Sequence, residues 1–558
     1  MAREKNNKSE HWDSNLGVVL AVAGSAVGLG NFLRFPGLVA IHGGAAFMIP
    51  YFISLLIVAL PIAWSEWALG RFGGRNGYHS LPGIYRAAGN RKTFWTASGG
   101  LVALVPLGIC MFYIFVEAWC LLYALQYLGG CLRPLGVEFS FFPTVESGLK
   151  LAASKDYTEA FNAFIGAGGD GALFQNFLKS PLLWATLICA TANFTLVYCG
   201  IAKGIERFCK IATPLLLLCA FLVIIRVATL GNPTGAEGQS FVDGLGYMWN
   251  PTRVSGADGQ TGVLAALANP SVWLAATSHI FFSASLCVGA IATYASYVKP
   301  KKDIALSSLT AVAANCFCEV ALGGLMTVPA AIMFLGFLGP ESFKSSFTIG
   351  FIVLPNVFGG MPGGEFFGFF FFSLLFIAGI TSSVSQAQPA VAWTKETLGL
   401  SRGPSVLLTA AVSLSGTALV CWYTKDAAAL DAFDFWIATF MPFVVVFLQT
   451  ALVAWIWGAN KMTDELDRGG KIRVPRCVGN VLKYLTTPYL TLIFLFWLLD
   501  ENGGARIIGD ATSPVWRKVG GFLIVIAAAM VVLTVIAAKR WRVEEEKNAQ
   551  DGSTDVSA

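Results

Sequence analysis

One apolar segment near the N-terminus limits what this chain can fold into more than any other feature. It runs from about residue 15 to residue 40 and is long enough to cross a bilayer as a helix. Three glycines crowd its middle, in the run AVAGSAVGLGNFLRFP: Gly24, Gly28 and Gly30. Each glycine costs a helix interior about 1 kcal/mol relative to Ala, so the segment is predicted to break at membrane depth.

A break in lipid is tolerated only where it lines a cavity inside the protein, because each bare N–H or C=O group there costs several kcal/mol. Carbonyls ending the first half can bind a cation, and N–H groups opening the second half can bind an anion. The alternative is a packing face, Gly24-x-x-x-Gly28, against another helix. Asn31 and Arg34 follow directly, and polar groups at this depth favour a binding site.

Composition places the whole chain in a membrane. Its 558 residues are 55% hydrophobic and 13% charged, whereas soluble domains carry about a quarter charged residues. The net charge of +5 gives no indication of a nucleic-acid partner. The first ten residues are polar and the first apolar stretch is too long for a signal peptide, so no cleavable signal is expected.

Twelve apolar spans can be counted, which predicts an all-α integral membrane protein with both ends of the chain on one side. They begin near residues 15, 45, 97, 181, 208, 271, 306, 366, 403, 433, 481 and 519. Lys and Arg concentrate in alternate short loops, whereas the long loop 231–270 holds only Arg253. This asymmetry predicts cytoplasmic termini in a multi-pass protein of the plasma (inner) membrane.

The sixth span, Ser271–Val298, is interrupted like the first, by Ser283, Ser285 and Gly289. Spans one and six each open a group of five, and because five is odd the second group must be inverted in the membrane. Paired interrupted segments in two halves indicate a transporter site. The expected organisation is an N-terminal segment, a first five-helix repeat, an outer loop, a second inverted repeat, two extra helices and a polar tail: 1–14, 15–230, 231–270, 271–459, 460–542 and 543–558.

Two segments outside the spans carry further expectations. Loop 336–365 contains Gly-Pro and Pro-Gly-Gly turns with aromatic residues between them, which predicts a loop that folds back over the mouth of the site. The tail Val543–Ala558 is polar, and its composition predicts disorder.

Spans seven and eight carry polar groups at helical spacing. Asn315 and Glu319 lie four apart on one face, and Ala378, Thr381 and Ser382 form a stripe of one carbonyl and two hydroxyls. Such hydroxyls can instead bond back to their own helix. Neutral oxygen ligands suit a hard monovalent cation, for which Na⁺ is the natural candidate, with H⁺ and K⁺ left open.

Several strings resemble the neurotransmitter:sodium symporter family, above all its bacterial amino-acid members of the leucine-transporter type. They are HWDSNLGVVLAVAGSAVGLGNFLRFP, GGAAFMIPY, KGIERFCKIATP, AIATYASYV and AGITSSVSQAQP. The likeness runs from His11 to about Trp541 and is weakest in loop 130–180.

The resemblance implies two sodium sites and one amino-acid site. The first sodium would be held by Ala26, Asn31, Ser283 and Asn315 together with the substrate carboxylate, and the second by Gly24, Val27, Ala378, Thr381 and Ser382. The substrate would meet Ala26, Leu29, Gly30, Tyr113, Phe282, Ser283 and Ser285, with its side chain lined by Ile109, Tyr113, Val288, Ser382 and Gln386. Gln386 stands where an aliphatic residue is usual; it bonds either within the protein or to a polar substrate side chain.

The resemblance also implies gates. Arg34 and Asp434 match the outer pair, and an inner cluster is matched by Trp12, Ser296, Tyr297 and Glu396. The usual inner arginine falls on Ser9, so Lys8 or Arg3 replaces it or the inner gate is weak.

Four further residues follow from the same resemblance. Glu66 matches a glutamate that braces the broken helices, and Cys287 stands where many relatives have Gly. Glu319 replaces the serine of chloride-dependent relatives and supplies a fixed negative charge near the cations, which predicts chloride independence. His279 occupies another position of that shell, usually Gln, and is expected to be a hydrogen-bonded structural residue.

The sequence thus predicts a sodium-coupled symporter, not an enzyme, that imports a small neutral amino acid across the bilayer. A transport-inactive amino-acid sensor or binding scaffold on the same fold is the alternative. No Ser/His/Asp set or HExxH motif is visible in the spans. The exact substrate, the stoichiometry and the oligomeric state, a homodimer included, stay open.

Overall fold

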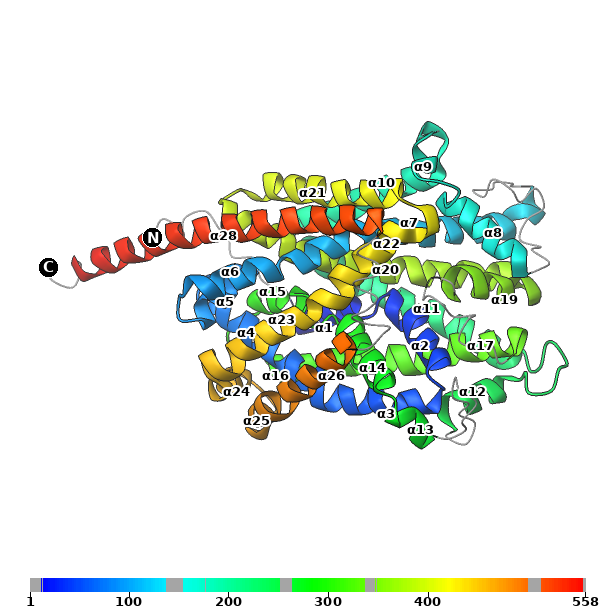
Figure 1. Ribbon diagram of the computed structural model, residues 1–558, viewed down its shortest axis with the longest axis horizontal. Helices are drawn as coiled ribbons and strands as arrows, with labels where there is room; N and C mark the ends of the chain where they lie inside the picture. The colour runs from blue at the N-terminus through cyan, green and yellow to red at the C-terminus, as the bar shows by residue number, and fades with distance from the viewer. Residues whose placement is uncertain are drawn as a thin grey trace.

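The computed structural model describes residues 12, 14–136, 154–175, 177–250, 263–336, 347, 349–499 and 513–554. Within these residues every secondary-structure element is a helix (Figure 1). Ten helices are long and apolar enough to cross a membrane, or eleven when the bent pair at the N-terminus counts as one span. The expected sixth span is not among them, because it is divided into two short helices.

The first half of the described chain contains the helices up to residue 249. The N-terminal broken segment consists of α1 (Asn15–Ala26), η1 (Gly30–Arg34) and α2 (Phe35–Ile41). The other elements are α3 (Ala45–Ser54), η2 (Leu55–Ala59), α4 (Leu60–Arg75), α5 (Leu81–Ala88), α6 (Thr93–Val102), α7 (Leu104–Leu132), η3 (Arg133–Leu135), α8 (Ser154–Ile165), α9 (Ala172–Gln175), η4 (Phe177–Lys179), α10 (Pro181–Cys199), η5 (Ile201–Glu206), α11 (Arg207–Thr229) and α12 (Phe241–Trp249).

The second half begins with α13 (Val263–Ala268) and a second broken segment, α14 (Pro270–Ser283) with α15 (Ala290–Ser296). The remaining elements are α16 (Ile304–Cys316), η7 (Phe317–Gly324), α17 (Leu325–Leu335), η9 (Ile349–Val353), α19 (Leu354–Gly360), α20 (Gly364–Leu398), α21 (Arg402–Trp422), η10 (Lys425–Ala427), α22 (Ala428–Phe433), η11 (Asp434–Phe440), α23 (Met441–Thr450), η12 (Ala451–Gly458), α24 (Ala459–Asp467), α25 (Cys477–Val481), η13 (Leu482–Thr486), α26 (Thr487–Leu499) and α28 (Pro514–Thr554).

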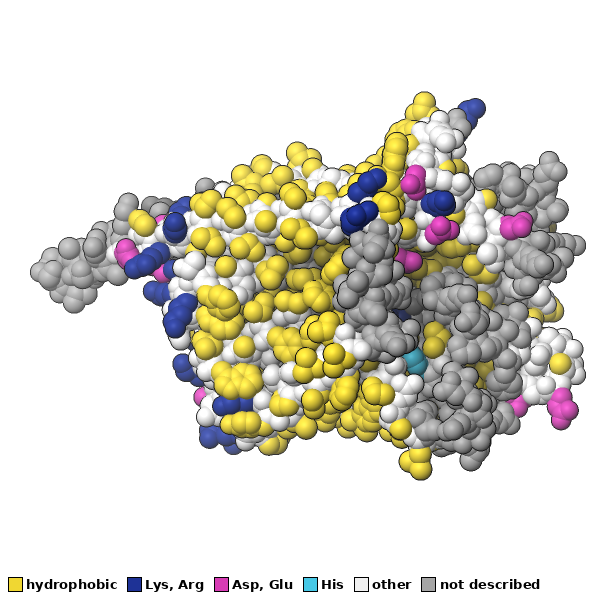
Figure 2. Space-filling view, viewed as in Figure 1, with side chains coloured by type: hydrophobic (Ala, Val, Ile, Leu, Met, Phe, Trp, Pro, Cys, Tyr) yellow, Lys and Arg dark blue, Asp and Glu magenta, His cyan; other side chains and the backbone are white. Residues whose placement is uncertain are grey.

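Helices α7 and α20 pack against each other at the centre of the molecule. The most apolar stretch of the α6–α7 segment is 94% buried, whereas the corresponding stretches of α26 and α28 are 22% buried. Figure 2 shows hydrophobic side chains spread along the flank of the molecule, which is the surface that lipid would cover. The central pair therefore forms a wall of the interior, and α26 and α28 lie at the periphery.

The N-terminal segment is broken where the glycines predict. Ser14 caps α1 by accepting a hydrogen bond from the Gly17 amide at 2.9 Å. Helix α1 ends at Ala26, Val27 leaves the helical region with φ −77° and ψ 89°, and the chain resumes as η1 at Gly30. The two parts are bent by 46° relative to each other.

Within the loop 336–365, η9 packs against α7; the expected fold of the whole loop over the mouth of the site stays a prediction, because residues 337–346 and 348 lie outside the described residues. The carbonyl of Phe351, in η9, accepts a hydrogen bond from the Tyr123 hydroxyl of α7 at 3.0 Å. The Phe351 ring also packs edge-on against Trp119 with 5.4 Å between centroids. This aromatic contact holds η9 against the end of α7.

The expected disorder of the tail Val543–Ala558 is wrong for residues 543–554. Helix α28 continues through Thr554, and residues 555–558 lie outside the described part. Glu545 accepts hydrogen bonds from Tyr78 at 2.7 Å and from Arg86 at 2.8 Å, and Trp541 is buried beside Tyr78. Docking against the α4–α5 region orders a segment that composition alone marks as polar.

A buried ion pair joins α4 to α24 at the same end of the molecule, where Lys and Arg side chains gather in Figure 2. Arg71 is fully buried and donates to Glu465 at 2.9 Å, to the Lys302 carbonyl at 2.7 Å and to the Arg468 carbonyl at 2.9 Å. Arg75 donates to the other carboxylate oxygen at 2.6 Å. These bonds satisfy charges that would otherwise be costly to bury.

Glu465→Ala should lower the free energy of unfolding by about 3–5 kcal/mol, because Arg71 would stay buried without its counter-charge. Thermal unfolding in detergent measures the loss. The matched control is Glu546→Ala, which removes an exposed pair with Arg542 four residues earlier and should cost under about 0.5 kcal/mol. Equal effects of the two variants would contradict the structural role of the α4–α24 pair.

Candidate substrate and ion site

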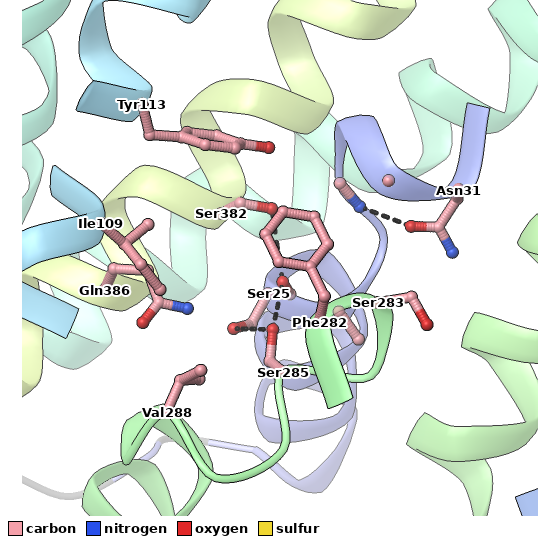
Figure 3. A pocket seen from close by; sticks show the side chains of 13 residues that line it. Ser25, Asn31, Ile109, Tyr113, Phe282, Ser283, Ser285, Val288, Ser382 and Gln386 are labelled. Carbon is pink, nitrogen blue, oxygen red and sulfur yellow. Dashed lines mark hydrogen bonds between the residues drawn. The ribbon is translucent and has the colours of Figure 1, made fainter. Parts of the chain in front are cut away.

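The two broken segments meet α7 and α20 around a small cavity (Figure 3). Its volume is about 30 Å³, enough for about two water molecules. Ten of the eleven residues expected around the substrate line it, and Leu29 does not. The lining consists of Ser25, Ala26, Gly28, Gly30, Asn31, Ile109, Tyr113, Phe282, Ser283, Ser285, Val288, Ser382 and Gln386.

The N–H groups of the first break are held by two side chains. The Gly28 amide donates to Asn31 Oδ1 at 2.9 Å, and the Leu29 amide donates to the Tyr113 hydroxyl at 3.2 Å. A Cβ at Gly28 would lie 2.8 Å from the Ser382 hydroxyl, so only glycine lets the backbone approach α20 this closely. Tyr113 thus stands beside the amides to which a carboxylate could bind.

Ser25 is a cavity residue that the sequence reasoning missed. Its carbonyl accepts hydrogen bonds from the Ser285 hydroxyl at 2.8 Å and from the Ser382 hydroxyl at 3.3 Å. It therefore ties the first break to the second break and to α20. Its place beside Gly24 in the glycine-rich run was the available signal.

The second break contains two non-glycine residues in the left-handed region. Ser285 has φ 52° and Cys287 has φ 60°, followed by Gly289 at φ 79°. The Cys287 amide donates to Glu66 Oε1 at 3.0 Å. Glu66 lies on α4, so this helix braces the break through one carboxylate oxygen.

Four oxygen-bearing residues expected at the first sodium site converge. Asn315 Oδ1 lies 3.1 Å from the Ala26 carbonyl oxygen and 3.2 Å from that of Ser283, and Asn31 Nδ2 donates to it at 2.7 Å. The carbonyl oxygens of Ala26 and Ser283 therefore converge on the side-chain amide of Asn315. Turning this amide by half a turn gives it hydrogen bonds to both carbonyls. The donor set fits a hard monovalent cation.

The residues expected at the second sodium site lie where α1 touches α20. A Cβ at Gly24 would lie 3.4 Å from Thr381 Cβ. The Thr381 hydroxyl donates to the carbonyls of Ile377 at 3.0 Å and Ala378 at 3.1 Å, which is the back-bonded alternative. Without an ion the hydroxyl is thus satisfied by its own helix.

Glu319 lies directly behind the first oxygen cluster. It accepts a hydrogen bond from Tyr51 at 2.6 Å and one from the Ser283 hydroxyl at 3.4 Å, and it pairs with His279 Nε2. His279 Nδ1 is buried without a partner among the described residues. His279 therefore meets Glu319 through Nε2 and acts as its hydrogen-bonding partner.

The expected outer pair is not closed. Among the described residues, Arg34 and Asp434 form no ion pair within 4.0 Å. The Arg34 guanidinium instead lies over the Phe282 ring, 4.9 Å from its centroid, where it gains a cation–π interaction. Phe282 separates Arg34 from the cavity.

The inner cluster is connected differently from the expectation. Trp12 Nε1 donates to the Tyr294 carbonyl at 3.1 Å. Glu396 accepts hydrogen bonds from the His79 amide at 2.7 Å and from the Ser80 hydroxyl at 2.6 Å. Lys8 and Arg3, the expected substitutes for an arginine, lie outside the described residues. The motif reasoning missed His79 and Ser80, since their part depends on where the α4–α5 loop folds.

Gln386 faces the cavity from α20. It is 5% exposed, and its Oε1 has no hydrogen-bond partner among the described residues. Figure 3 shows Gln386, Ile109 and Val288 on one side of the cavity, and Asn31 and Ser283 on the other. The ion-type oxygens and the side-chain pocket are therefore at opposite ends.

A cavity between two broken helices, within an all-helical membrane protein, is typical of a secondary transporter. The chain belongs to the Sodium:neurotransmitter symporter family, which it matches over residues 9–136 and 174–543. Sodium use and a transport role, rather than an enzymatic one, follow from this membership.

Individual proteins support the assignment. An uncharacterized sodium-dependent transporter of Methanocaldococcus jannaschii is 28% identical, with 92% of each chain covered. The human sodium- and chloride-dependent GABA transporter 2 is 26% identical over 94% of this chain and 85% of its own. The crystal structure of MhsT in complex with L-phenylalanine superposes with a TM-score of 0.69 at 25% identity, covering 87% of this chain and 99% of that one.

The strained backbone at Cys287 gives a test of the second break. Cys287→Gly should cost less stability than Cys209→Gly by about 1–2 kcal/mol, because a left-handed residue other than glycine is strained by about that amount. Both thiols are buried, and Cys209 lies within the regular helix α11. Thermal unfolding in detergent compares them, and an equal or greater loss for Cys287→Gly would refute the strain.

Proposed function

We propose that this protein is a sodium-coupled symporter that imports a neutral amino acid by alternating access. The carbonyl oxygens of Ala26 and Ser283, which converge on the Asn315 amide beside the broken first helix, carry the proposal. Oxygen dipoles can hold Na⁺, and the N–H end of the second half of the break can hold a carboxylate. An amino acid zwitterion supplies that carboxylate, and its ammonium can reach the carbonyl-rich ends of the broken helices.

The repeat and orientation belong to the same proposal. We count α14 and α15 as one broken span, which with the N-terminal pair gives twelve spans in two inverted groups of five plus two. Both breaks meeting at one cavity supports this arrangement. Clustering of Lys and Arg at the end that bears α5 and α24 supports a cytoplasmic position for that end and for both termini in the plasma membrane.

Two sodium ions are proposed, at the two clusters described above. Sodium would favour the outward-open state, and substrate would permit closure by Phe282, Tyr113, Arg34 and Asp434. The cation–π contact of Arg34 with Phe282 supports a role for both in the outer closure. The likeness to MhsT with bound L-phenylalanine supports an amino-acid substrate. A homodimer stays a prediction.

Purified protein in proteoliposomes should take up a labelled amino acid only when a sodium gradient points inward. The variant Thr381→Ala with Ser382→Ala should need about tenfold more sodium for half-maximal uptake, a loss of about 1.4 kcal/mol, since carbonyls alone leave the second ion under-coordinated. Thr409→Ala with Thr417→Ala is the matched control, because these two buried hydroxyls lie on α21, outside the cavity lining and both proposed ion sites. Binding without uptake would favour an inactive sensor, and unchanged sodium dependence in the first variant would refute the second site.

Chloride independence rests on the charge of Glu319 beside Ser283. A fixed carboxylate near the cation supplies the negative charge that a bound chloride would supply in a relative without this carboxylate. The Glu319 carboxylate is held in place by a hydrogen bond from Tyr51 at 2.6 Å and lies 3.4 Å from the Ser283 hydroxyl.

Replacing chloride with gluconate should therefore leave uptake by the unmodified protein unchanged. Glu319→Ser should make uptake stimulated by chloride, because the site then lacks its negative charge. Glu319→Gln, which keeps the shape and loses the charge, separates charge from packing. Loss of uptake by the unmodified protein in gluconate would contradict the role given to Glu319.

The residues around the pocket indicate which amino-acid side chains the site would accept. Val288 and Ile109 leave an apolar wall, whereas Gln386 places an amide with an unpartnered oxygen at the same end. A substrate with a polar side-chain atom can satisfy this amide, and leucine cannot. We therefore infer a medium to large neutral amino acid with no strong preference for leucine.

Gln386→Ile should improve binding of leucine relative to glutamine by about tenfold or more, since an unsatisfied buried amide costs about 1–3 kcal/mol. Competition by all twenty amino acids against a labelled substrate measures the ranking. Gln388→Ile is a control two residues along α20, where the amide donates to Tyr297 at 3.5 Å rather than lining the cavity. A ranking unchanged by Gln386→Ile would remove Gln386 from the pocket.

A further inference from the structure

We propose that His79, in the loop between α4 and α5, is the positioning residue that closes the cytoplasmic side of this transporter. It would clamp α15 to α20, the role that the resemblance gives to a charge pair between Glu396 and a basic residue of the N-terminal segment. The inference rests on the proposed function, because it needs α15 and α20 to separate during transport.

The α20 side of the clamp is the carboxylate of Glu396. It accepts hydrogen bonds from the amides of His79 at 2.7 Å and Ser80 at 3.1 Å, and from the Ser80 hydroxyl at 2.6 Å. Ser80 is also the N-cap of α5, so the carboxylate lies at the positive end of that helix. Three donors hold the charge that an arginine would otherwise neutralise.

The α15 side of the clamp is made by the His79 ring. Its Nδ1 lies 3.0 Å from the Ser296 hydroxyl oxygen, and that hydroxyl donates its own proton to the Thr293 carbonyl at 2.7 Å. Nδ1 must therefore carry a proton and donate. The ring also stacks on Tyr297 with 4.2 Å between centroids and 9° between planes.

One loop residue thus touches both helices whose separation would open the cavity to this side. Helix α15 is the second half of the broken segment, and its Tyr294 hydroxyl lies 3.0 Å from that of Ser385 on α20. Moving α15 away from α20 must break either the contacts of the His79 ring with Ser296 and Tyr297 or the hydrogen bonds of its loop to Glu396. Trp12 holds the same turn of α15 from the N-terminal side.

The loop is fixed from behind by the end of α28. Glu545 accepts hydrogen bonds from Tyr78, next to His79, and from Arg86 of α5. Burial would lower the pKa of Arg86, but the hydrogen bond and charge of Glu545 outweigh it and raise that pKa. The clamp is therefore mounted on a loop that the C-terminal helix keeps in place.

The test measures access to Ser385, which is fully buried between α15 and α20. Ser385→Cys is introduced, and a membrane-impermeant maleimide is applied to the full-length protein in sodium-free detergent solution. Peptide mass spectrometry separates this thiol from the twelve native cysteines. Adding His79→Ala should speed labelling of residue 385 by about 3–10-fold, the effect of losing one to two weak contacts.

Two further variants separate the contacts. His79→Phe keeps the stack on Tyr297, and His79→Asn keeps a donor toward Ser296, so each should label at an intermediate rate. Both also decide the matter where His79→Ala does not fold. His42→Ala is the matched control, since His42 stacks on Phe47 after α2 and should leave the rate unchanged.

Labelling of residue 385 that stays at the parent rate in the folded His79 variants would overturn the clamp. Acceleration by His42→Ala as large as that by His79→Ala would also overturn it. The readout needs no transport, so absence of sodium-driven uptake would defeat the proposed function while this result still decides the clamp.

Discussion

The structure depends on how two interrupted helices satisfy their backbone in an apolar surrounding. Lipid offers no hydrogen bonds, so the N–H and C=O groups freed at each break must find partners inside the protein. At the first break Asn31 and Tyr113 accept hydrogen bonds from the amides of Gly28 and Leu29, respectively. At the second, Glu66 accepts the amide of Cys287. The cavity exists because these groups are held apart rather than joined in one continuous helix.

The charges around the cavity are arranged in layers. The lining offers carbonyls, hydroxyls and amides, whereas the carboxylates of Glu66 and Glu319 are set behind it. Neutral dipoles can bind a cation and release it. A carboxylate behind the lining attracts the cation without coordinating it directly. The Arg34 charge is also kept behind the lining, because the aromatic ring of Phe282 lies between it and the cavity.

The cavity is flanked by different contacts on its two sides. On one side the Arg34 guanidinium lies over the Phe282 ring and forms no ion pair with Asp434. On the other side Glu396 is held by the loop before α5, which Glu545 holds in turn. The polar end of α28 thereby supports the loop that holds Glu396.

The sequence by itself determined the apolar spans, the break at Gly24–Gly30 and most of the cavity lining. Those features depend on local composition and on motifs within single segments, and each segment carries its own signal. The tertiary structure decided which oxygens converge on Asn315, and that Ser25 joins both breaks. It alone brought His79 onto Ser296 and Tyr297, and ordered the polar residues around Glu545. Most of these contacts join segments more than 200 residues apart, and a pairing of that kind depends on helix packing, which no local pattern encodes.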